Sequence, residues 1–411
     1  MSILDTIRKQ LNPPKSSNKM SFRSITNVPS EVPVVAEKPN IEWVYYGEHN
    51  LYPLQLHDLK YGSPIHNSIL KTKAKMMAGD GLLYNGAKTK EESETLYTGF
   101  PVNTKAEVDF LQSNKFGGMP LENLQDALAQ DYQDYGAYCY KIIFNKDFTK
   151  IAGIKYYKVE NIRSGKEVDG KIKNYYYSKD WTKSKQGSFK PEVLWNYDPK
   201  DREHIEQVIY RKIGNDDYYG ITNYSGAINW VHIDFQMGIF HRSNIENGMN
   251  PGLHFKFYKT FANDEEEDRV REMVKKQWQG AMNAGKMIMT TSDGKDLAMD
   301  IQPIEVSGLD KQLLLLAELS DQKILTGHQL TTPMLAGITS NKGLGNTGTE
   351  LETGYELFDG LSMASDRKVL RNDIQMWFDY NKTGVKVDIN KFKPFTTVPK
   401  AQPQFTISQN G

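Results

Sequence analysis

The stretch Asn223-Tyr-Ser-Gly-Ala-Ile-Asn-Trp230, continued as far as Asn247, decides how this chain is organised. It contains no proline, and its larger apolar residues recur at steps of three and four, which predicts a long amphipathic helix. These residues are Ile228, Val231, Phe235, Ile239 and Phe240. The run Asn247-Gly-Met-Asn-Pro-Gly252 then ends the helix, because it is dense in helix-breaking residues.

A second helix is predicted from Leu309 to Leu330, where leucines and isoleucine again recur at helical spacing. It ends before Thr331-Thr332-Pro333, because the residue that precedes a proline is biased away from the helical conformation. A glycine-rich loop with one charged residue, Lys342, continues to Gly348. Thr347 and Glu350 have the spacing of a capping box, which predicts a third long helix running toward Trp377.

The insert between the first two helices has its own pattern of elements. Leu253-His-Phe-Lys-Phe-Tyr258 alternates like a strand, and Asn263 with Glu266 predicts the capped start of a helix whose apolar stripe includes Trp278. Lys286-Met-Ile-Met-Thr290 and Leu297–Ile304 are then expected to form a hairpin. An insert this small buries little surface, so packing against neighbouring copies is expected. Capping also explains the acidic run 264–268 better than a cation site does.

Composition limits the classes of function. The 411 residues suggest two or three domains, and 51 basic residues balance 51 acidic ones, unlike the basic excess of a protein that grips nucleic acid tightly. The single cysteine, Cys139, is expected to be buried in a strand, and it fits a reducing compartment. The start of the chain lacks the apolar core of a signal peptide, and no apolar run is long enough for a bilayer, so an intracellular protein is expected.

The first half of the chain is predicted to contain helices followed by short strands. Ser63-Pro64 predicts a helix start, and Leu121–Tyr135 is a second helix. Lys71, Lys73 and Lys75 spread around the first of these helices, so they are expected to be solvated rather than to form a phosphate patch. From Tyr138 to Ile213 short strands follow, in which tyrosines and lysines alternate. Strand composition explains this pattern better than stacking on bases does.

Several motifs resemble those of tailed-bacteriophage portal proteins, over roughly Trp43 to Phe395. The motifs are Ser63-Pro-Ile-His-Asn-Ser-Ile-Leu-Lys-Thr-Lys-Ala-Lys-Met-Met-Ala-Gly79, Tyr218-Tyr-Gly-Ile-Thr-Asn-Tyr-Ser-Gly-Ala-Ile228, Asn247-Gly-Met-Asn-Pro-Gly252, Asn283-Ala-Gly-Lys-Met-Ile-Met289 and Leu330-Thr-Thr-Pro-Met-Leu-Ala-Gly337. The resemblance implies an α+β, portal-like fold and a homo-oligomeric ring, expected to be a dodecamer, that conducts DNA at one capsid vertex.

The resemblance also implies a division of the chain into the named parts of a portal. These are a flexible arm (1–40), a wing (41–222 and 349–400), two stem helices (223–248 and 308–330), a clip (249–307), a tunnel loop (331–348) and a tail (401–411). Portals carry a crown beyond the wing, but only the short tail remains here, so the crown is expected to be reduced or absent.

The expected site residues fall in two of these parts. Thr339, Ser340, Asn341, Lys342, Gly343 and Asn346 are expected to line the channel on the tunnel loop, and Trp278, Phe255, Phe257 and Met287 are expected at a clip or oligomer interface. The expected partners are further copies of the chain, transiently bound double-stranded DNA, the major capsid protein, the large subunit of terminase and head–tail adaptor proteins, but no membrane. The expected location is the portal vertex of a virion assembled in the host cytoplasm.

No enzymatic activity, metal or cofactor is expected. Gly343–Gly348 matches G-x-G-x-x-G, but no buried strand precedes it. The sequence lacks a Walker lysine–serine pair, an H-E-x-x-H motif and a nucleophile elbow. Two alternatives to a portal remain open, namely another ring-forming head–tail adaptor and a DNA-processing enzyme.

Overall fold

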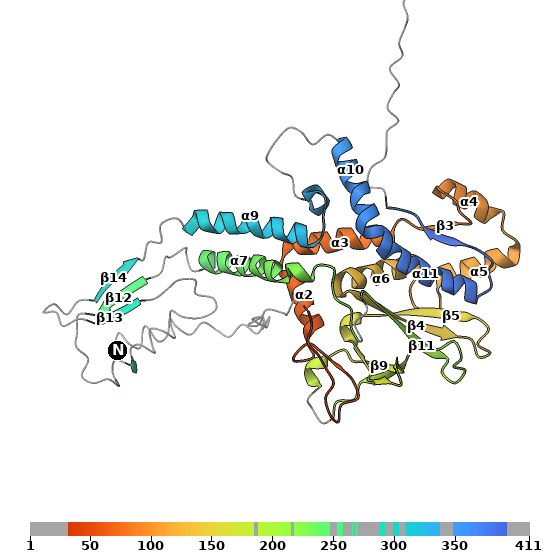
Figure 1. Ribbon diagram of the computed structural model, residues 1–411, viewed down its shortest axis with the longest axis horizontal. Coiled ribbons are helices and arrows are strands. Elements are labelled where there is room, and N and C mark those ends of the chain that lie inside the picture. Colours follow the sequence, from red (N-terminus) through yellow and green to blue (C-terminus); the bar gives the residue numbers. More distant parts are fainter. Residues whose placement is uncertain are drawn as a thin grey trace, which may run out of the picture.

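The computed structural model describes residues 32–184, 188–214, 218–246, 253–257, 265, 268–269, 288–291, 299–303, 309–337 and 348–392. It is elongated, with a main body of helices and sheets and a pair of long helices that extend from the body toward a small sheet (Figure 1). Helices and strands are mixed along the chain, which confirms the predicted α+β class.

The main body is built on the antiparallel sheet β11-β4-β5. Its strands are β4 (Ala137–Phe144), β5 (Ile151–Tyr157) and β11 (Glu206–Lys212). Aromatic and branched residues dominate β4, and such side chains suit a strand buried on both faces. Cys139 is fully buried on this strand, as predicted.

Three helices complete the main core with this sheet: α3 (Pro64–Ala78), α6 (Leu121–Tyr135) and α11 (Ala364–Tyr380). The first begins as predicted, because the Ser63 side chain accepts a hydrogen bond from the His66 backbone and Pro64 occupies the first turn. Helix α11 buries Leu370, Ile374 and Trp377 at helical spacing, and the Trp377 ring meets Tyr140 of β4 edge to face.

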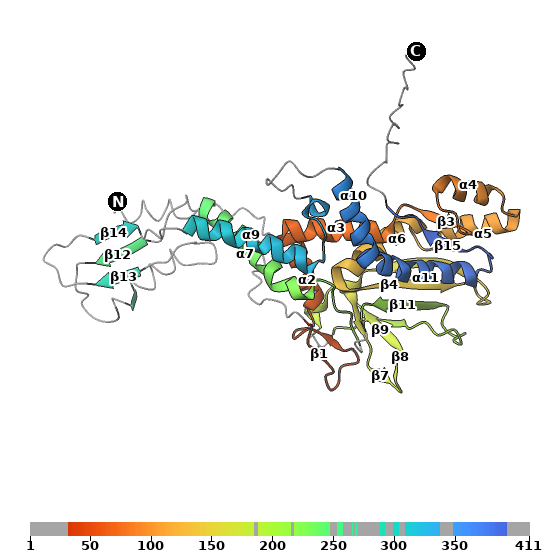
Figure 2. The ribbon, with the colours of Figure 1, turned by 45° about the horizontal axis from the view of Figure 1, so that its top comes forward.

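The remaining elements of the body lie around this core (Figure 2). They are β1 (Val35–Ala36), β2 (Tyr45–Tyr46), α2 (Tyr52–Gly62), β3 (Leu82–Tyr84), α4 (Lys90–Thr98), α5 (Val102–Ser113), β6 (Ile162–Ser164), β7 (Glu167–Val168), β8 (Lys171–Ile172), β9 (Asn174–Tyr177), β10 (Glu192–Trp195) and β15 (Val387–Ile389). Strand β3 pairs antiparallel with β15, which joins the first and last parts of the described chain. Tyr175 and Tyr176 of β9 are buried, so these tyrosines are part of the packed sheet.

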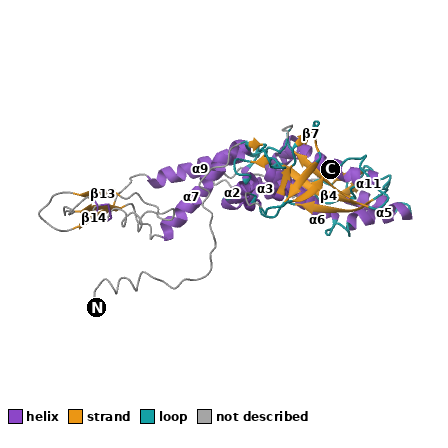
Figure 3. Ribbon diagram, turned by 90° about the horizontal axis from the view of Figure 1, so that it is seen from below, coloured by secondary structure: helices purple, strands orange, loops and turns teal. Residues whose placement is uncertain are grey.

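The two predicted long helices are α7 (Ile228–Glu246) and α9 (Leu309–Gly327), and each is about 28 Å long at 1.5 Å per residue. They run antiparallel, because Gly327 at the end of α9 lies against Ala227 at the start of α7. A Cβ at position 327 would lie 2.3 Å from the Ala227 Cβ, so the missing side chain permits this close approach. Figure 3 shows the pair leading away from the body.

The insert contributes three described strands: β12 (Leu253–Phe257), β13 (Ile288–Thr291) and β14 (Met299–Pro303). Their order is β13-β12-β14, with β12 parallel to β13 and antiparallel to β14. The predicted hairpin between the last two is therefore wrong, since β12 lies between them. A parallel pair needs a long crossover connection, which the chain between β12 and β13 provides.

One other sequence interpretation needs correction. Of the three lysines on α3, Lys71 and Lys75 are exposed, but Lys73 is buried rather than solvated, because α3 is enclosed by α6, α11 and the end of α9. The long helix predicted to run toward Trp377 is confirmed, since the chain is helical from Gly348 to Tyr380. It consists of α10 (Gly348–Phe358), a π-helical turn, η5 (Asp359–Met363), and α11.

Candidate functional site

The predicted site residues lie mostly outside the described residues. All six positions of the expected channel loop fall within 338–347, and Trp278 and Met287 of the expected clip interface also lie outside. Phe255 and Phe257 lie on β12, where their backbones pair with Ile301 and Met299 of β14. The described parts on either side of 338–347 show how the body holds this loop.

The incoming end of the loop is fixed to α3. The chain leaves α9 and forms a short 3-10 turn, η4 (Pro333–Ala336), after Thr332. The Ser68 hydroxyl donates a hydrogen bond of 2.8 Å to the Ala336 carbonyl. Gly337 follows with φ +81°, a left-handed conformation that glycine adopts without strain, and it ends the η4 turn.

The outgoing end returns beside the incoming end. The Thr331 hydroxyl donates a hydrogen bond of 2.6 Å to the carbonyl of Gly354 on α10. A Cβ at Gly354 would lie only 3.1 Å from the Thr332 side chain, so the two segments are in close contact. The segments that flank loop 338–347 therefore belong to one packed unit, which we call the loop frame. It consists of η4, α10 and the α3 residues that pack against them.

A buried imidazole pair secures the end of α9 to the start of α3. His66 Nδ1 lies 2.8 Å from His328 Nε2, and both rings pack against Tyr224. Burial, followed by the charges of Lys60 and Lys73, lowers the pKa of His66 to about 3. Burial also lowers the pKa of His328 well below its usual value. Both rings are therefore neutral, and one N–H is shared between them.

Lys73 places a cation inside the same region of α3. Burial lowers its pKa to about 8, although the Asp366 carboxylate acts in the opposite direction. Burial raises the pKa of Asp366, which accepts a hydrogen bond of 2.8 Å from Gln133. The hydrogen bond links α6 to α11, and the Asp366 carboxylate interacts electrostatically with Lys73 of α3 in the interior of the body.

A second buried charge cluster holds the π-helical turn. The Asp359 carboxylate is bound by the Arg367 guanidinium and lies 2.8 Å from the Lys391 ammonium. Burial alone would raise the pKa of Asp359, but hydrogen bonds from Arg367 and Lys391 leave it lowered overall. Arg367 also donates to the Met76 carbonyl at the end of α3, so the turn is tied to the same helix as the loop frame.

The helix pair presents leucines to solvent. Leu314, Leu315 and Leu319 of α9 are 62%, 64% and 40% exposed in the single chain. They lie on the face opposite Ser320 and Ile324, the buried residues of this helix. Large apolar side chains grouped on one helix face are typical of a surface that another protein covers.

Among the described residues, no three histidine, cysteine or acidic side chains are grouped to hold a metal ion. None of the described helices combines the length and apolar character that crossing a membrane requires. The buried ions and imidazoles instead connect α3, α9, α10 and α11, the elements that carry loop 338–347.

Comparison with known proteins identifies the class of fold. No protein-family model matches the chain, and no curated protein matches it. Among solved structures, a chain in the virion of a native gene transfer agent (GTA) particle has a TM-score of 0.52 at 15% identity, covering 87% of this chain and 86% of its own. A chain in the neck of a native GTA particle, computed with C12 symmetry, gives the same values.

A weaker similarity, with a TM-score of 0.41 and 10% identity, links 79% of this chain to 92% of an HK97-family phage portal protein from Corynebacterium diphtheriae. The GTA similarities show that the chain has the fold of a virion neck component over nearly its full length.

Proposed function

We propose that this chain is a portal protein, which assembles into a ring at one vertex of a capsid and conducts DNA through its centre. The observation that carries the proposal is the shared fold over 87% of this chain with a chain in the C12-symmetric GTA neck. The match covers most of both chains, and the C12 symmetry of that neck supports a ring of twelve copies.

The parts of the portal are assigned to the observed elements. Helices α7 and α9 serve as the stem, residues 249–307 with the β12 sheet as the clip, and the body as the wing. The antiparallel helix pair and the small sheet at its far end support this assignment. The exposed leucines of α9 are the surface through which neighbouring stems contact each other in the ring.

Residues 331–348 serve as the tunnel loop. The loop frame supports this role, since it bonds the segment before 338–347 to α3 through Ser68 and to α10 through Thr331. Polar residues such as Thr339, Ser340 and Asn341, together with Lys342, would make weak, exchangeable contacts with phosphates as DNA slides past.

The docking partners follow from this position in the particle. The ring contacts the major capsid protein at its vertex, the terminase large subunit during packaging and head–tail adaptor proteins afterwards. The particle origin of the similar chains supports association with a capsid.

The test is the assembly state of the purified full-length chain. Negative-stain microscopy should show a ring with a central hole and a narrower stalk, and native mass spectrometry should give a mass close to that of twelve 47.0 kDa chains. A chain that stays monomeric at every concentration and salt, alone and with its capsid and scaffold proteins, would refute the portal assignment.

A further inference from the structure

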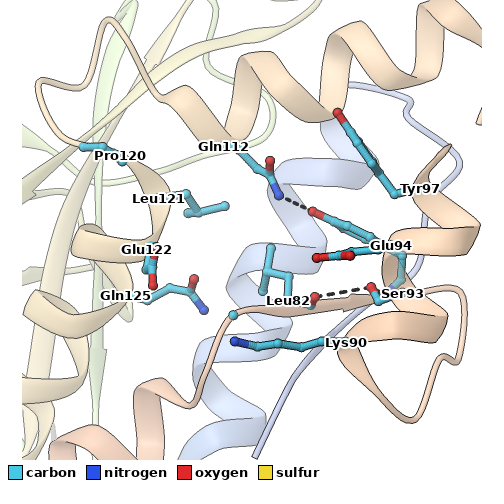
Figure 4. Close-up of a pocket in the computed structure, with 12 residues that line it drawn as sticks. Leu82, Lys90, Ser93, Glu94, Tyr97, Gln112, Pro120, Leu121, Glu122 and Gln125 are labelled. Carbon is cyan, nitrogen blue, oxygen red and sulfur yellow. Dashed lines mark hydrogen bonds between the residues drawn. The ribbon is translucent and has the colours of Figure 1, made fainter.

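A cavity of about 450 Å³ lies at the end of the body opposite the β12 sheet. Four elements surround it: β3, α4, α5 and the start of α6 (Figure 4). Leu82, Pro120 and Leu121 give it an apolar part, and polar side chains of α4, α5 and α6 surround the rest. A cavity of this size accommodates one long side chain together with a short length of backbone.

Three polar side chains of the wall, Tyr84, Ser93 and Gln112, are bonded within the wall. The Ser93 hydroxyl accepts from the Tyr84 backbone N–H at 3.1 Å and donates to the Leu82 carbonyl, and the Gln112 amide donates to the Tyr84 hydroxyl. Burial, the largest cause, raises the pKa of Tyr84, so its phenol stays protonated. These groups give the wall a fixed shape rather than free binding groups.

The Gln125 side chain differs from these three, because its amide nitrogen has no hydrogen bond within the wall. Its side chain belongs to a residue that is only 3% exposed, and its Nε2 has no hydrogen-bond partner among the described residues. Figure 4 shows the amide turned into the cavity from α6. A buried N–H donor needs an acceptor, so a ligand here must offer an oxygen such as a peptide carbonyl.

The charge of the cavity is negative. Glu94 of α4 and Glu122 of α6 line it, and within the described chain neither carboxylate forms an ion pair. Lys90, the one cation of the lining, is bound by Asp80 at 2.6 Å. One turn beyond Glu122, burial and then the Glu122 charge raise the pKa of Asp126, as expected where carboxylates are crowded. A cationic group would relieve this crowding.

We propose that this cavity binds an extended peptide segment of a partner protein through a lysine or arginine side chain. The cationic head lies between Glu94 and Glu122, its methylene stem lies against Leu82 and Leu121, and the segment's backbone carbonyl accepts from Gln125 Nε2. A free polyamine would satisfy the carboxylates but offers no acceptor to Gln125, so the buried amide favours a peptide.

The test is calorimetric titration of the full-length chain with acetyl-Gly-Arg-Gly-amide at low ionic strength. The same peptide with citrulline, the uncharged isostere of arginine, should bind at least tenfold more weakly. Glu94→Gln combined with Glu122→Gln should lower the affinity for the arginine peptide at least tenfold. Glu91→Gln, which removes one negative charge of α4 outside the cavity, should leave its affinity unchanged.

The variant Gln125→Met distinguishes peptide binding from the binding of a small cation. It should lower the affinity for the arginine peptide severalfold and leave the affinity for spermidine unchanged. Thermal unfolding confirms that the variant is folded. Three outcomes would overturn the proposal: no binding of the arginine peptide, equal affinity for the citrulline peptide, or an affinity for the arginine peptide that Gln125→Met leaves unchanged. Spermidine binding without peptide binding would instead identify a site for small cations.

Discussion

His66 and His328, which are 262 residues apart in the sequence, share a hydrogen bond of 2.8 Å inside the body. The first lies in the opening turn of α3, and the second follows the last residue of α9. The pair therefore sets where the long helix pair joins the body, immediately before the chain enters the loop frame.

This pair predicts a loss of stability in acid. Burial holds both folded pKa values below the ordinary 6.5, so the unfolded chain binds more protons as the pH falls below that value. The stability is fully present above pH 6.5 and is lost as the pH falls toward the folded value of about 3, by up to about 1.4 kcal/mol per pH unit for each histidine.

The measurement is urea unfolding of wild type and of His66→Leu combined with His328→Met, between about pH 6.5 and pH 5. Replacing both partners by apolar groups removes the pair without leaving an unpaired group. The double variant should show the shallower fall in the free energy of unfolding. Since all other titrating groups are common to both proteins, equal slopes would contradict neutral buried imidazoles.

The contact between Gly327 and Ala227 predicts a specific steric defect. Gly327→Ala should destabilise the protein by about 1–3 kcal/mol, because the new methyl group would lie 2.3 Å from the Ala227 Cβ. Adding Ala227→Gly should restore most of the loss. Gly238→Ala on α7, where a Cβ meets no atom within 4 Å, is the matched control and should not destabilise. A neutral Gly327→Ala would show that the helices can separate there freely.

Removal of the Asp359 carboxylate at the π-helical turn should lower the free energy of unfolding. Asp359→Ala leaves the buried Arg367 guanidinium without its partner, so a loss of about 3–5 kcal/mol in the free energy of unfolding is expected. The control is Glu356→Ala, which removes the exposed partner of Lys391 at 3.6 Å and should cost less than about 1 kcal/mol. Similar losses for the two variants, measured by urea unfolding, would refute a structural role for the buried cluster.

The leucines of α9 are expected to hold the ring together. Leu315→Glu should shift the assembly from rings to smaller species, because it places a charge on a surface that other copies cover. Val102→Glu makes the same kind of change at an apolar residue of α5 that is 84% exposed, and it should leave the rings intact. Mass photometry of both variants distinguishes the outcomes, and intact Leu315→Glu rings would place the subunit interface elsewhere.

The proposed tunnel loop can be tested at Lys342, its one charged residue. Lys342→Glu should leave ring assembly unchanged and reduce the DNA packaged or retained, since a ring of acidic groups repels the phosphate backbone. Lys342→Gln removes the charge without reversing it, so the DNA that this control variant packages should lie between the amounts for Lys342→Glu and wild type. Normal packaging of full-length genome by Lys342→Glu, at low and high salt, would reduce the loop to a connection between helices.

Elements with a strong local signal could be predicted from the sequence. The helices α7 and α9, the start of α3 at Ser63-Pro64 and the strand containing Cys139 all follow from apolar periodicity or capping residues. Contacts between distant segments could not, because periodicity is local. The His66–His328 pair is such a contact, since nothing in the sequence indicates that these two residues meet.

Two errors have the same origin. Spacing alone could not show that Lys73 is enclosed from several sides, and a strand pattern could not reveal that β12 lies between β13 and β14. Helices α4 and α5, which line the cavity, were not predicted because their apolar stripes are short. The Thr89 side chain, which accepts from the Glu92 backbone at the start of α4, was the available signal.

The close approach of Ala227 and Gly327 also has an evolutionary consequence. The chain between them starts and ends at one point, so it is topologically an insertion into the rest of the fold. Its first and last turns, which carry Val231 and Ile324, pack in the core of the body, and the excursion is the part beyond them. The entropy of closing such an excursion grows only slowly, by about 0.6 kcal/mol for each doubling of its length. Relatives of this chain can therefore lengthen or shorten the excursion with little effect on the folding of the body.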